Sequence, residues 1–336
     1  MKKYIIVTDS TTDLPDSYAN ESGIKIVPLG FSIDGKNYKD YLNKRELSTK
    51  DFYDMISTGK TAKTYQVNPK EFYDVFKEII DSGYGVLGII FSSGLSGTFN
   101  SARFAKDQIL AENPNAEIVV IDSLCASLGE GLLVHYALKA QKEGMTLYEA
   151  QDYLENLKMK ISHWFTVMDL DTLKRGGRVS AAAAFFAKTL NIHPVLHVSN
   201  EGKLVARMKK IGRKNALNTI AEKLFETYIP DENEVICISH SCCLEDANKL
   251  KEAMDTDIKL IACSVMSCVA MGMLLCICAP LFPRLYNTSD SVKVLAASFM
   301  RVAAICMPIH GFAHASYFTL RSGGKTFITF LFDSVY

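Results

Sequence analysis

The most constraining feature of this sequence is the alternation of short apolar runs with amphipathic segments over its first 160 residues. The runs at residues 4–8, 86–91 and 117–121 have the length of buried strands, and each ends in a polar turn. Segments with helical periodicity separate them. Because parallel strands need crossover helices to return to the same edge, residues 1–160 are predicted to form an α/β domain with a mostly parallel sheet and helices on both faces.

Two helix starts in this region can be located from their capping residues. Ser48 precedes one amphipathic segment, and Asn68 stands directly before Pro69 at the start of the next. Ser and Asn side chains accept hydrogen bonds from the free N–H groups of a first helical turn, and Pro suits the first helical position. We therefore expect helices from about residues 49 and 69. Residues 23–29 are expected to add a strand.

A second domain of mixed architecture is predicted for residues 161–260. A strand is expected at residues 165–167, and the runs at 193–198 and 203–208 flank Asn200-Glu201-Gly202, a typical hairpin turn. A hairpin combined with helices indicates an α+β domain. The remaining predicted elements are helices at 181–189, 215–228 and 244–254 and a strand at 235–239.

The distribution of charge changes after residue 260. The whole chain has 37 basic and 37 acidic residues, so no net charge attracts nucleic acid. Only 7 of the last 76 residues are charged, and residues 260–283 are 24 residues without a charge. At about 1.5 Å per residue, a helix of that length crosses a bilayer core of about 30 Å. Residues 261–336 are therefore expected to be an apolar helical tail with a transmembrane helix, able to associate with a membrane.

Residues 1–260 are expected to be cytoplasmic. The nine cysteines of the chain match no zinc-binding spacing, and they do not form a disulfide framework typical of small secreted domains. The opening residues, MKKYIIV, are too short an apolar run for a signal peptide. We expect no metal and no cofactor.

The turn at residues 92–98 is the sharpest local feature. It follows a buried strand, and Gly94 and Gly97 let its backbone turn tightly. Ser93, Ser96 and Thr98 present hydroxyl and N–H groups at a helix start, where the helix dipole favours an anion. An ordinary N-cap with turn glycines is an equally good interpretation.

Two further segments are weaker candidates for binding. The connector at residues 61–66 contains Thr61 and Gln66, which could donate to a carboxylate, although a solvated loop is the simpler interpretation. Arg175 and Arg178 flank two glycines, and together with Arg207 they could dock an acidic partner or form a solvated basic face. Aromatic residues do not interleave with these cations, which argues against nucleic acid.

Two classes of enzyme are disfavoured. The turn lacks the last glycine of the G-x-S-x-G elbow, so a lipid hydrolase that uses Ser93 or Ser96 as nucleophile has no supporting motif. The Gly-Lys-Thr triplets at residues 59–61 and 324–326 lack the first glycine of a phosphate-binding loop. The residues by themselves therefore support neither a hydrolase nor a nucleoside triphosphatase.

His240 follows the apolar run at residues 235–239 and could reach a ligand, although a lone histidine at the end of a strand is more often structural.

Residues 1–260 resemble the DegV family of bacterial fatty-acid-binding proteins. The resemblance rests on residues 7–14 (VTDSTTDL), 61–66 (TAKTYQ), 91–98 (FSSGLSGT) and 173–178 (LKRGGR), in this order and spacing. It implies two domains that bury one long-chain fatty acid between them. It also implies, for some members, a role as the binding subunit of a fatty-acid kinase, in which a separate ATP-binding subunit phosphorylates the acyl carboxyl group.

The resemblance further implies which side chains hold the carboxylate. By motif these are Thr61 and Ser93, with Gly94, Ser96, Thr98 and Gln66 around them. Hydroxyl donors satisfy a carboxylate in a dry pocket without a buried counter-charge. An apolar tunnel would stabilise the acyl tail by about 0.8 kcal/mol per buried CH₂.

The end of the chain departs from this family. A G-S-H-T-G-P-G-like segment, whose His belongs to the carboxyl site in the family, does not follow residue 260, so the second domain is expected to be truncated. Residues 281–287 (LFPRLYN), 316–326 (SYFTLRSGGKT) and 330–334 (FLFDS) resemble instead a fragment of a MATE efflux transporter. The two interpretations are a chimeric sequence without function in its tail and a membrane-tethered lipid carrier.

Overall fold

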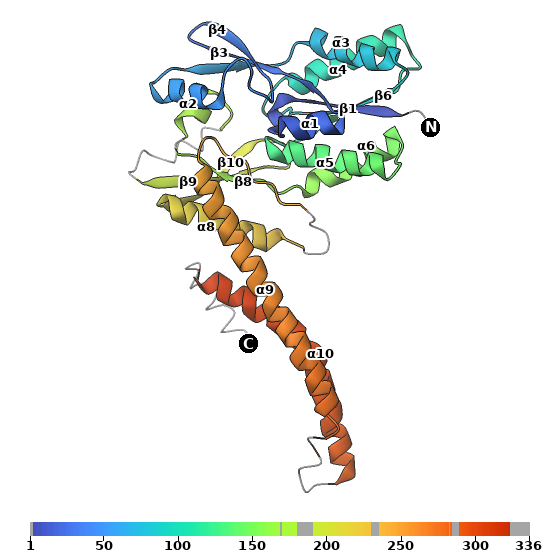
Figure 1. The fold of residues 1–336 in the computed structure, drawn as a ribbon, viewed down its shortest axis with the longest axis vertical. Helices are drawn as coiled ribbons and strands as arrows, with labels where there is room; N and C mark the ends of the chain where they lie inside the picture. Colours follow the sequence, from blue (N-terminus) through green and yellow to red (C-terminus); the bar gives the residue numbers. More distant parts are fainter. Residues whose placement is uncertain are drawn as a thin grey trace. The chain divides into compact units, whose positions relative to one another are not determined.

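The computed structural model describes residues 3–168, 170–179, 191–229, 235–281, 283 and 289–322. The chain divides into two compact units, residues 1–247 and 248–336, and each is considered by itself. Figure 1 follows the chain from blue at the N-terminus to red at the C-terminus. The first unit contains three sheets, and the second contains long helices.

A four-stranded parallel sheet organises the first unit. Its order is β2 (Lys25–Val27), β1 (Tyr4–Asp9), β6 (Gly85–Ile90) and β7 (Ile118–Asp122). Neighbouring strands pair in parallel throughout, with Ile5 opposite Val86 and Val86 opposite Ile118. The predicted parallel sheet is therefore confirmed.

Helices cover both faces of this sheet (Figure 1). The strand β6 is buried along its whole length and alternates between two cores. Leu87 packs with Leu133 in one core, and Val86 packs with Phe72 in the other. The elements are α1 (Asp16–Ser22), α5 (Leu128–Lys142) and α6 (Leu147–Leu157) on the first side, α3 (Pro69–Asp81) and α4 (Thr98–Glu112) on the second, and the short 3₁₀ helices η1 (Ser10–Thr12) and η2 (Lys158–Lys160).

Both predicted helix starts are confirmed. Ser48 Oγ accepts a hydrogen bond of 3.1 Å from the N–H of Asp51 and caps α2 (Thr49–Ser57). Asn68 Oδ1 accepts a hydrogen bond of 2.9 Å from the N–H of Lys70 and caps α3.

A small antiparallel sheet was not expected from the sequence. It consists of β4 (Lys36–Asp40), β3 (Leu29–Ile33) and β5 (Ala62–Tyr65), in that order. The apolar run predicted as one strand at residues 23–29 is divided between β2 and β3, which belong to different sheets. The strand β5 is mostly exposed and has no apolar alternation, so its sequence carried no strand signal.

A second antiparallel sheet follows residue 160, with the order β10 (Leu204–Ile211), β9 (Ile192–Val198) and β8 (Trp164–Thr166). Its β9–β10 hairpin was predicted, and Val198 pairs with Leu204 across the turn. The helix α8 (Arg213–Thr227) packs against all three strands, and α7 (Asp171–Arg175) precedes β9.

Two predictions for this region have different outcomes. Residues 235–239 are not a strand: among the described residues they pair with neither β8 nor β10, and Ile236 is exposed. An apolar run forms a strand only where another strand offers hydrogen bonds. The helix predicted at residues 181–189 lies outside the described residues.

The chain beyond residue 243 contains the helices α9 (Leu244–Cys278) and α10 (Asp290–Ser322). The boundary expected at residue 260 falls inside α9, which continues through it without a break. Among the described residues, no helix combines the length and apolar character needed to cross a membrane, so the transmembrane prediction for residues 260–283 has no support. The apolar run at residues 326–336 lies outside the described residues.

Candidate functional site

The loop that follows β6 lies at the carboxyl edge of the parallel sheet. Residues 91–97, called the 91–97 loop below, connect β6 to α4. Asp9 ends β1 and Asp122 ends β7, the strands on either side of β6. Because parallel strands end at the same edge, these carboxyl groups flank the loop. Ligands of open α/β sheets bind at this edge.

Ser93 stands at the exposed tip of the 91–97 loop. Its backbone N–H donates a hydrogen bond of 3.0 Å to Oδ1 of Asp122, which fixes the backbone at this point. The residue is exposed, and no hydrogen bond engages its hydroxyl within the part of the chain that the structure describes. The Ser93 hydroxyl is therefore available to a ligand.

Ser96 and Thr98 have a different role from Ser93. Oγ of Ser96 accepts a hydrogen bond of 3.2 Å from the Thr98 N–H and lies 2.9 Å from Oγ1 of Thr98. Thr98 is fully buried. Both hydroxyls are thus engaged with each other beside the start of α4, whose N-cap residue is Gly97 and which has no side-chain cap.

Gln66 and Gly97 lie against each other. Nε2 of Gln66 donates a hydrogen bond of 3.2 Å to Oγ of Ser101 in α4. Its Oε1 atom lies 1.9 Å from the position that a Cβ atom on Gly97 would occupy. The next residue, Val67, donates its N–H to Oγ1 of Thr98 at 3.4 Å. The structure thus brings Gln66 to the helix start, and Gly97 is needed for the close approach.

Thr61 does not join this group. It precedes β5, whereas Gln66 follows it, so the two residues are about 16 Å apart at about 3.3 Å per strand residue. Thr64 is closer, because it stands only two positions before Gln66. The Tyr65 ring occupies the space over Gly30 on one face of β5, and Thr64 therefore projects from the other face. The sequence motif indicated Thr61 and not Thr64.

The β9–β10 turn packs directly onto the 91–97 loop. Oγ of Ser92 donates a hydrogen bond of 2.8 Å to the carbonyl oxygen of Gly202 and accepts one of 3.1 Å from the Gly94 N–H. A Cβ atom on Gly94 would lie 2.7 Å from the carbonyl oxygen of Glu201. Gly94 therefore permits close packing of two backbones, a role that the predicted ligand site did not include.

The three predicted docking arginines differ in their surroundings. Nε of Arg178 donates a hydrogen bond of 3.3 Å to the carbonyl oxygen of Leu95, and its guanidinium also contacts the Gly176 carbonyl. Arg178, which lies between α7 and β9, thus contacts the backbone of the 91–97 loop. Arg207 is exposed on β10, and Arg175 ends α7.

Two buried carboxyl groups beneath the loop were missed from the sequence. Asp9 and Glu130 are both fully buried, and burial raises the pKa of each. Oδ2 of Asp9 accepts a hydrogen bond of 2.9 Å from the N–H of Phe91, the first residue of the 91–97 loop. Asp9 ends a buried strand and lies in the segment 7–14 that carries the family resemblance, whereas no sequence signal pointed to Glu130.

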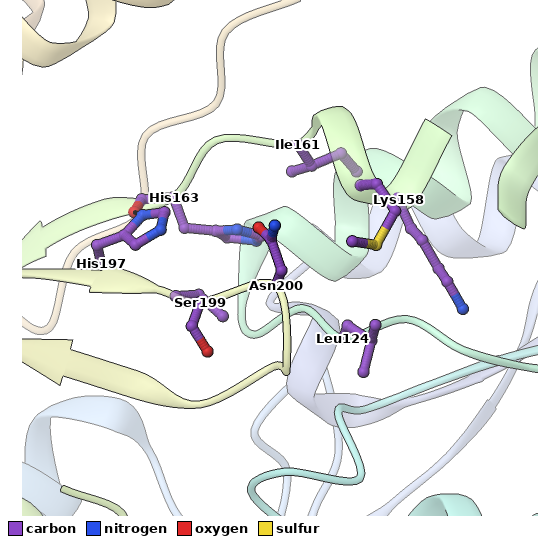
Figure 2. Close-up of a pocket in the computed structure, with 9 residues that line it drawn as sticks. Leu124, Lys158, Ile161, His163, His197, Ser199 and Asn200 are labelled. Atoms are coloured by element: carbon purple, nitrogen blue, oxygen red, sulfur yellow. Dashed lines mark hydrogen bonds between the residues drawn. The ribbon is translucent and has the colours of Figure 1, made fainter. Parts of the chain in front are cut away.

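Figure 2 shows a small pocket that Ser199 and Asn200, directly after β9, help to line. Its volume is about 20 Å³, which holds one water molecule and not an acyl chain. Burial lowers the pKa of His163 to about 4, and its Nε2 atom lies 1.4 Å from the position of a Cβ atom on Gly129. The pocket is lined by Leu124, Lys158, Met159, Ile161, His163, His197, Val198, Ser199 and Asn200.

These features define an α/β protein whose candidate site is a hydroxyl-bearing loop at the carboxyl edge of a parallel sheet. The chain belongs to the DegV family: the profile of this family, described as uncharacterised proteins, matches residues 3–272. That match crosses the boundary expected at residue 260. The comparisons give no support to the resemblance between residues 261–336 and a MATE transporter.

Three relatives illustrate the similarity. A DegV domain-containing protein of Clostridium perfringens is 40% identical over 252 residues, which cover 75% of this chain and 86% of the relative. The structure of a fatty-acid-binding DegV family protein from Streptococcus agalactiae is 30% identical with a TM-score of 0.68, covering 76% of this chain and 88% of its own. A DegV family protein from Thermus thermophilus, described by its fatty acid binding, is 32% identical with a TM-score of 0.59, covering 67% and 78%.

Proposed function

We propose that this protein binds a long-chain fatty acid and holds its carboxylate at the 91–97 loop. The observation that carries the proposal is the exposed Ser93 hydroxyl beside the start of α4, in a family whose solved members include fatty-acid-binding proteins. The first turn of a helix leaves N–H groups without intrahelical partners, and these favour an anion. A hydroxyl and such N–H groups suit a carboxylate without a buried counter-charge.

Mass spectrometry of the full chain purified from cells tests this proposal. We expect a bound long-chain acid in the parent protein and in Ser17→Ala, a control at an exposed serine of α1. A hydrogen bond to a charged group contributes about 1.5–3 kcal/mol, so Ser93→Ala should bind about 10- to 100-fold more weakly. A parent chain without any fatty acid, or equal loading of Ser93→Ala, would refute the proposal.

A second pair of variants identifies the threonine that completes the site. Thr64, two residues before Gln66, is the better placed donor, and Thr61 is the residue expected from the motif. Thr64→Ala should therefore reduce fatty-acid loading more than Thr61→Ala. The reverse order would restore the motif-based prediction.

We further propose that the bound acid is presented to a separate ATP-binding kinase subunit. The exposure of Ser93 supports this step, because a carboxylate held there remains accessible to a second protein. The carboxylate oxygen would attack the γ-phosphorus of ATP on the kinase and yield an acyl phosphate and ADP. The exposed Arg207 is a candidate for docking an acidic surface.

Trapping the acyl phosphate with hydroxylamine in a mixture of this protein, ATP and the kinase subunit tests presentation. Arg207→Ala should slow hydroxamate formation without changing fatty-acid loading. Lys77→Ala, in α3, should leave both unchanged. A rate that is the same for Arg207→Ala and the parent chain would exclude this arginine from docking.

A further inference from the structure

We propose that Asp9 and Glu130 share a single proton through the Thr11 hydroxyl, with Asp9 ionised and Glu130 protonated, and that this arrangement positions the 91–97 loop. The protonation states of Asp9 and Glu130 follow from their own contacts. Only the effect of the positioned loop on a bound carboxylate rests on the proposed function. Asp9 ends β1, Thr11 lies in η1, and Glu130 lies in the first turn of α5.

The Thr11 hydroxyl lies between the two carboxyl groups. Its Oγ1 atom is 2.6 Å from Oδ1 of Asp9 and 2.9 Å from Oε2 of Glu130. A hydroxyl has one hydrogen, and ionised carboxylates only accept hydrogen bonds. Thr11 can therefore donate to only one of the two groups. The other contact must be donated by a carboxyl group that carries a proton.

The remaining contacts of Asp9 show that it is the acceptor. Its Oδ1 atom accepts the Thr11 N–H at 3.0 Å, and its Oδ2 atom accepts the Phe91 N–H at 2.9 Å. Backbone N–H groups can only donate, so both oxygens of Asp9 face donors. Ionised Asp9 satisfies all of these contacts, and it also accepts the Thr11 hydroxyl hydrogen.

Glu130 can carry the proton without losing a partner. Its Oε1 atom accepts a hydrogen bond of 3.1 Å from the Thr8 hydroxyl, and its Oε2 atom contacts the Thr11 hydroxyl. A proton on Oε2 is donated to Thr11, whose own hydrogen then points to Asp9. With Glu130 donating to Thr11 and Thr11 donating to Asp9, each of these hydrogen bonds has one hydrogen between its two oxygen atoms.

The electrostatic environment agrees with this arrangement. Burial raises the pKa of Glu130 well above its ordinary value, and the charge of Asp9 raises it further. Burial also raises the pKa of Asp9, but hydrogen bonds from Thr11 and Phe91 oppose that shift. Two ionised carboxylates this close would repel each other in a dry interior. Asp40 acts on Asp9 and Asp13 acts on Glu130, and both raise the pKa of the group they face. The groups around these neighbours are Lys44 beside Asp13, and Lys158 and Asp122 beside Cys125, whose pKa Glu130 raises.

The shared proton has a consequence for the candidate site. The Asp9–Phe91 hydrogen bond fixes the residue that leads into Ser92 and Ser93. Ionisation of Glu130 would reverse the donation at Thr11 and place a second charge beside Asp9. Asp9 and Glu130 therefore act as positioning residues for the loop, without contact with a ligand.

Two isosteric variants distinguish the two carboxyl groups. In Glu130→Gln the amide N–H replaces the carboxyl O–H toward Thr11, and the amide oxygen still accepts from Thr8. We expect this variant to fold and to retain slow hydrogen exchange at the Phe91 amide. In Asp9→Asn a donor would face an N–H group of Thr11 or Phe91. We expect it to lower the melting temperature and to increase exchange at the Phe91 amide.

The pH dependence of the melting temperature tests the shared proton, because a purely structural role of Glu130 would not change it. Because the pKa of Glu130 is raised on folding, the folded state binds more protons than the unfolded state at pH values above the ordinary range for Glu. The stability contributed by Glu130 is full below that range and is lost as the pH rises toward the folded pKa. Glu130→Gln should therefore gain in melting temperature over the parent chain as the pH rises from 4 to 8. Glu21→Gln, at an exposed site of α1, should show no such gain.

Infrared difference spectroscopy detects the proton directly. The parent chain should show the carbonyl band of a protonated carboxylic acid at pH 7, and Glu130→Gln should lack it. Absence of this band, or a band that persists in Glu130→Gln and disappears in Asp9→Asn, would overturn the assignment. Normal exchange of the Phe91 amide in Asp9→Asn would overturn the positioning role. These measurements need no ligand. A chain without bound fatty acid would therefore refute the proposed function, and the infrared and exchange experiments would still decide whether Asp9 and Glu130 share a proton.

Discussion

The Ser92 hydroxyl donates a hydrogen bond of 2.8 Å to the carbonyl oxygen of Gly202, which is 110 residues further along the chain. Ser92 is fully buried, and Gly202 has a φ of +68°. A Cβ atom on Gly202 would lie 1.9 Å from the Ser92 hydroxyl oxygen. One contact thus joins the candidate binding loop to the β9–β10 turn, and it depends on a glycine for two reasons.

We expect Gly202→Ala to destabilise the protein through both effects. A positive φ costs an L-residue about 1–2 kcal/mol, and forcing a methyl group against Ser92 adds about 1–3 kcal/mol. Gly35→Ala provides the matched control, since Gly35 has a φ of +81° but, apart from its chain neighbours, no atom of the described residues lies within 4 Å of its Cβ position. Thermal or urea unfolding should show a larger loss for Gly202→Ala. Equal losses would mean that the backbone strain alone matters.

The contact between Gln66 and Gly97 predicts non-additive variants. Gly97→Ala should displace the Gln66 side chain and break its hydrogen bond to Ser101, with a loss of about 1 kcal/mol. Gln66→Ala removes the same hydrogen bond and leaves room for the new methyl group. Gly97→Ala should therefore cost less in the Gln66→Ala background, with a coupling of about 0.5–1 kcal/mol in urea unfolding. Strict additivity would contradict the proposed contact.

Local sequence signals predicted the parallel sheet and its helices well. Val86 and its neighbours in β6 form a run that is apolar on both faces, and Ser48 and Asn68 are caps whose effect is confined to one turn. These features act within a few residues, so the sequence contains them. The expected strand at residues 235–239 failed because strand formation needs a partner elsewhere in the chain.

The sequence indicated the loop residues of the candidate site, but it did not indicate the distant residues that pack against them. Ser93 and Gly94 follow a buried strand directly, and their position at the sheet edge could be read from the order of elements. The partners of the loop come from distant segments, as Glu130 and Gly202 show. Long-range packing selects these partners, and a single sequence gives no signal for them.

The buried His163 predicts how the protein responds to acid. Burial lowers the pKa of His163 to about 4 from its ordinary value of 6.5, and the nearby His197 lowers it further. The Nε2 atom of His163 is buried beside the backbone of Gly129, and none of the residues that the structure describes forms a hydrogen bond with it. The neutral ring is therefore the form that the folded state accepts.

The pH dependence of unfolding should reveal this histidine. Between pH 6.5 and about 4 the unfolded chain binds a proton at His163 that the folded chain excludes. The stability contributed by the neutral ring is therefore complete above pH 6.5 and is lost as the pH falls toward 4, by up to about 3 kcal/mol. His163→Gln should flatten the fall in melting temperature over this window, whereas His240→Gln, at an exposed site, should reproduce the parent curve. An unchanged slope in His163→Gln would show that the ring is protonated in the folded protein.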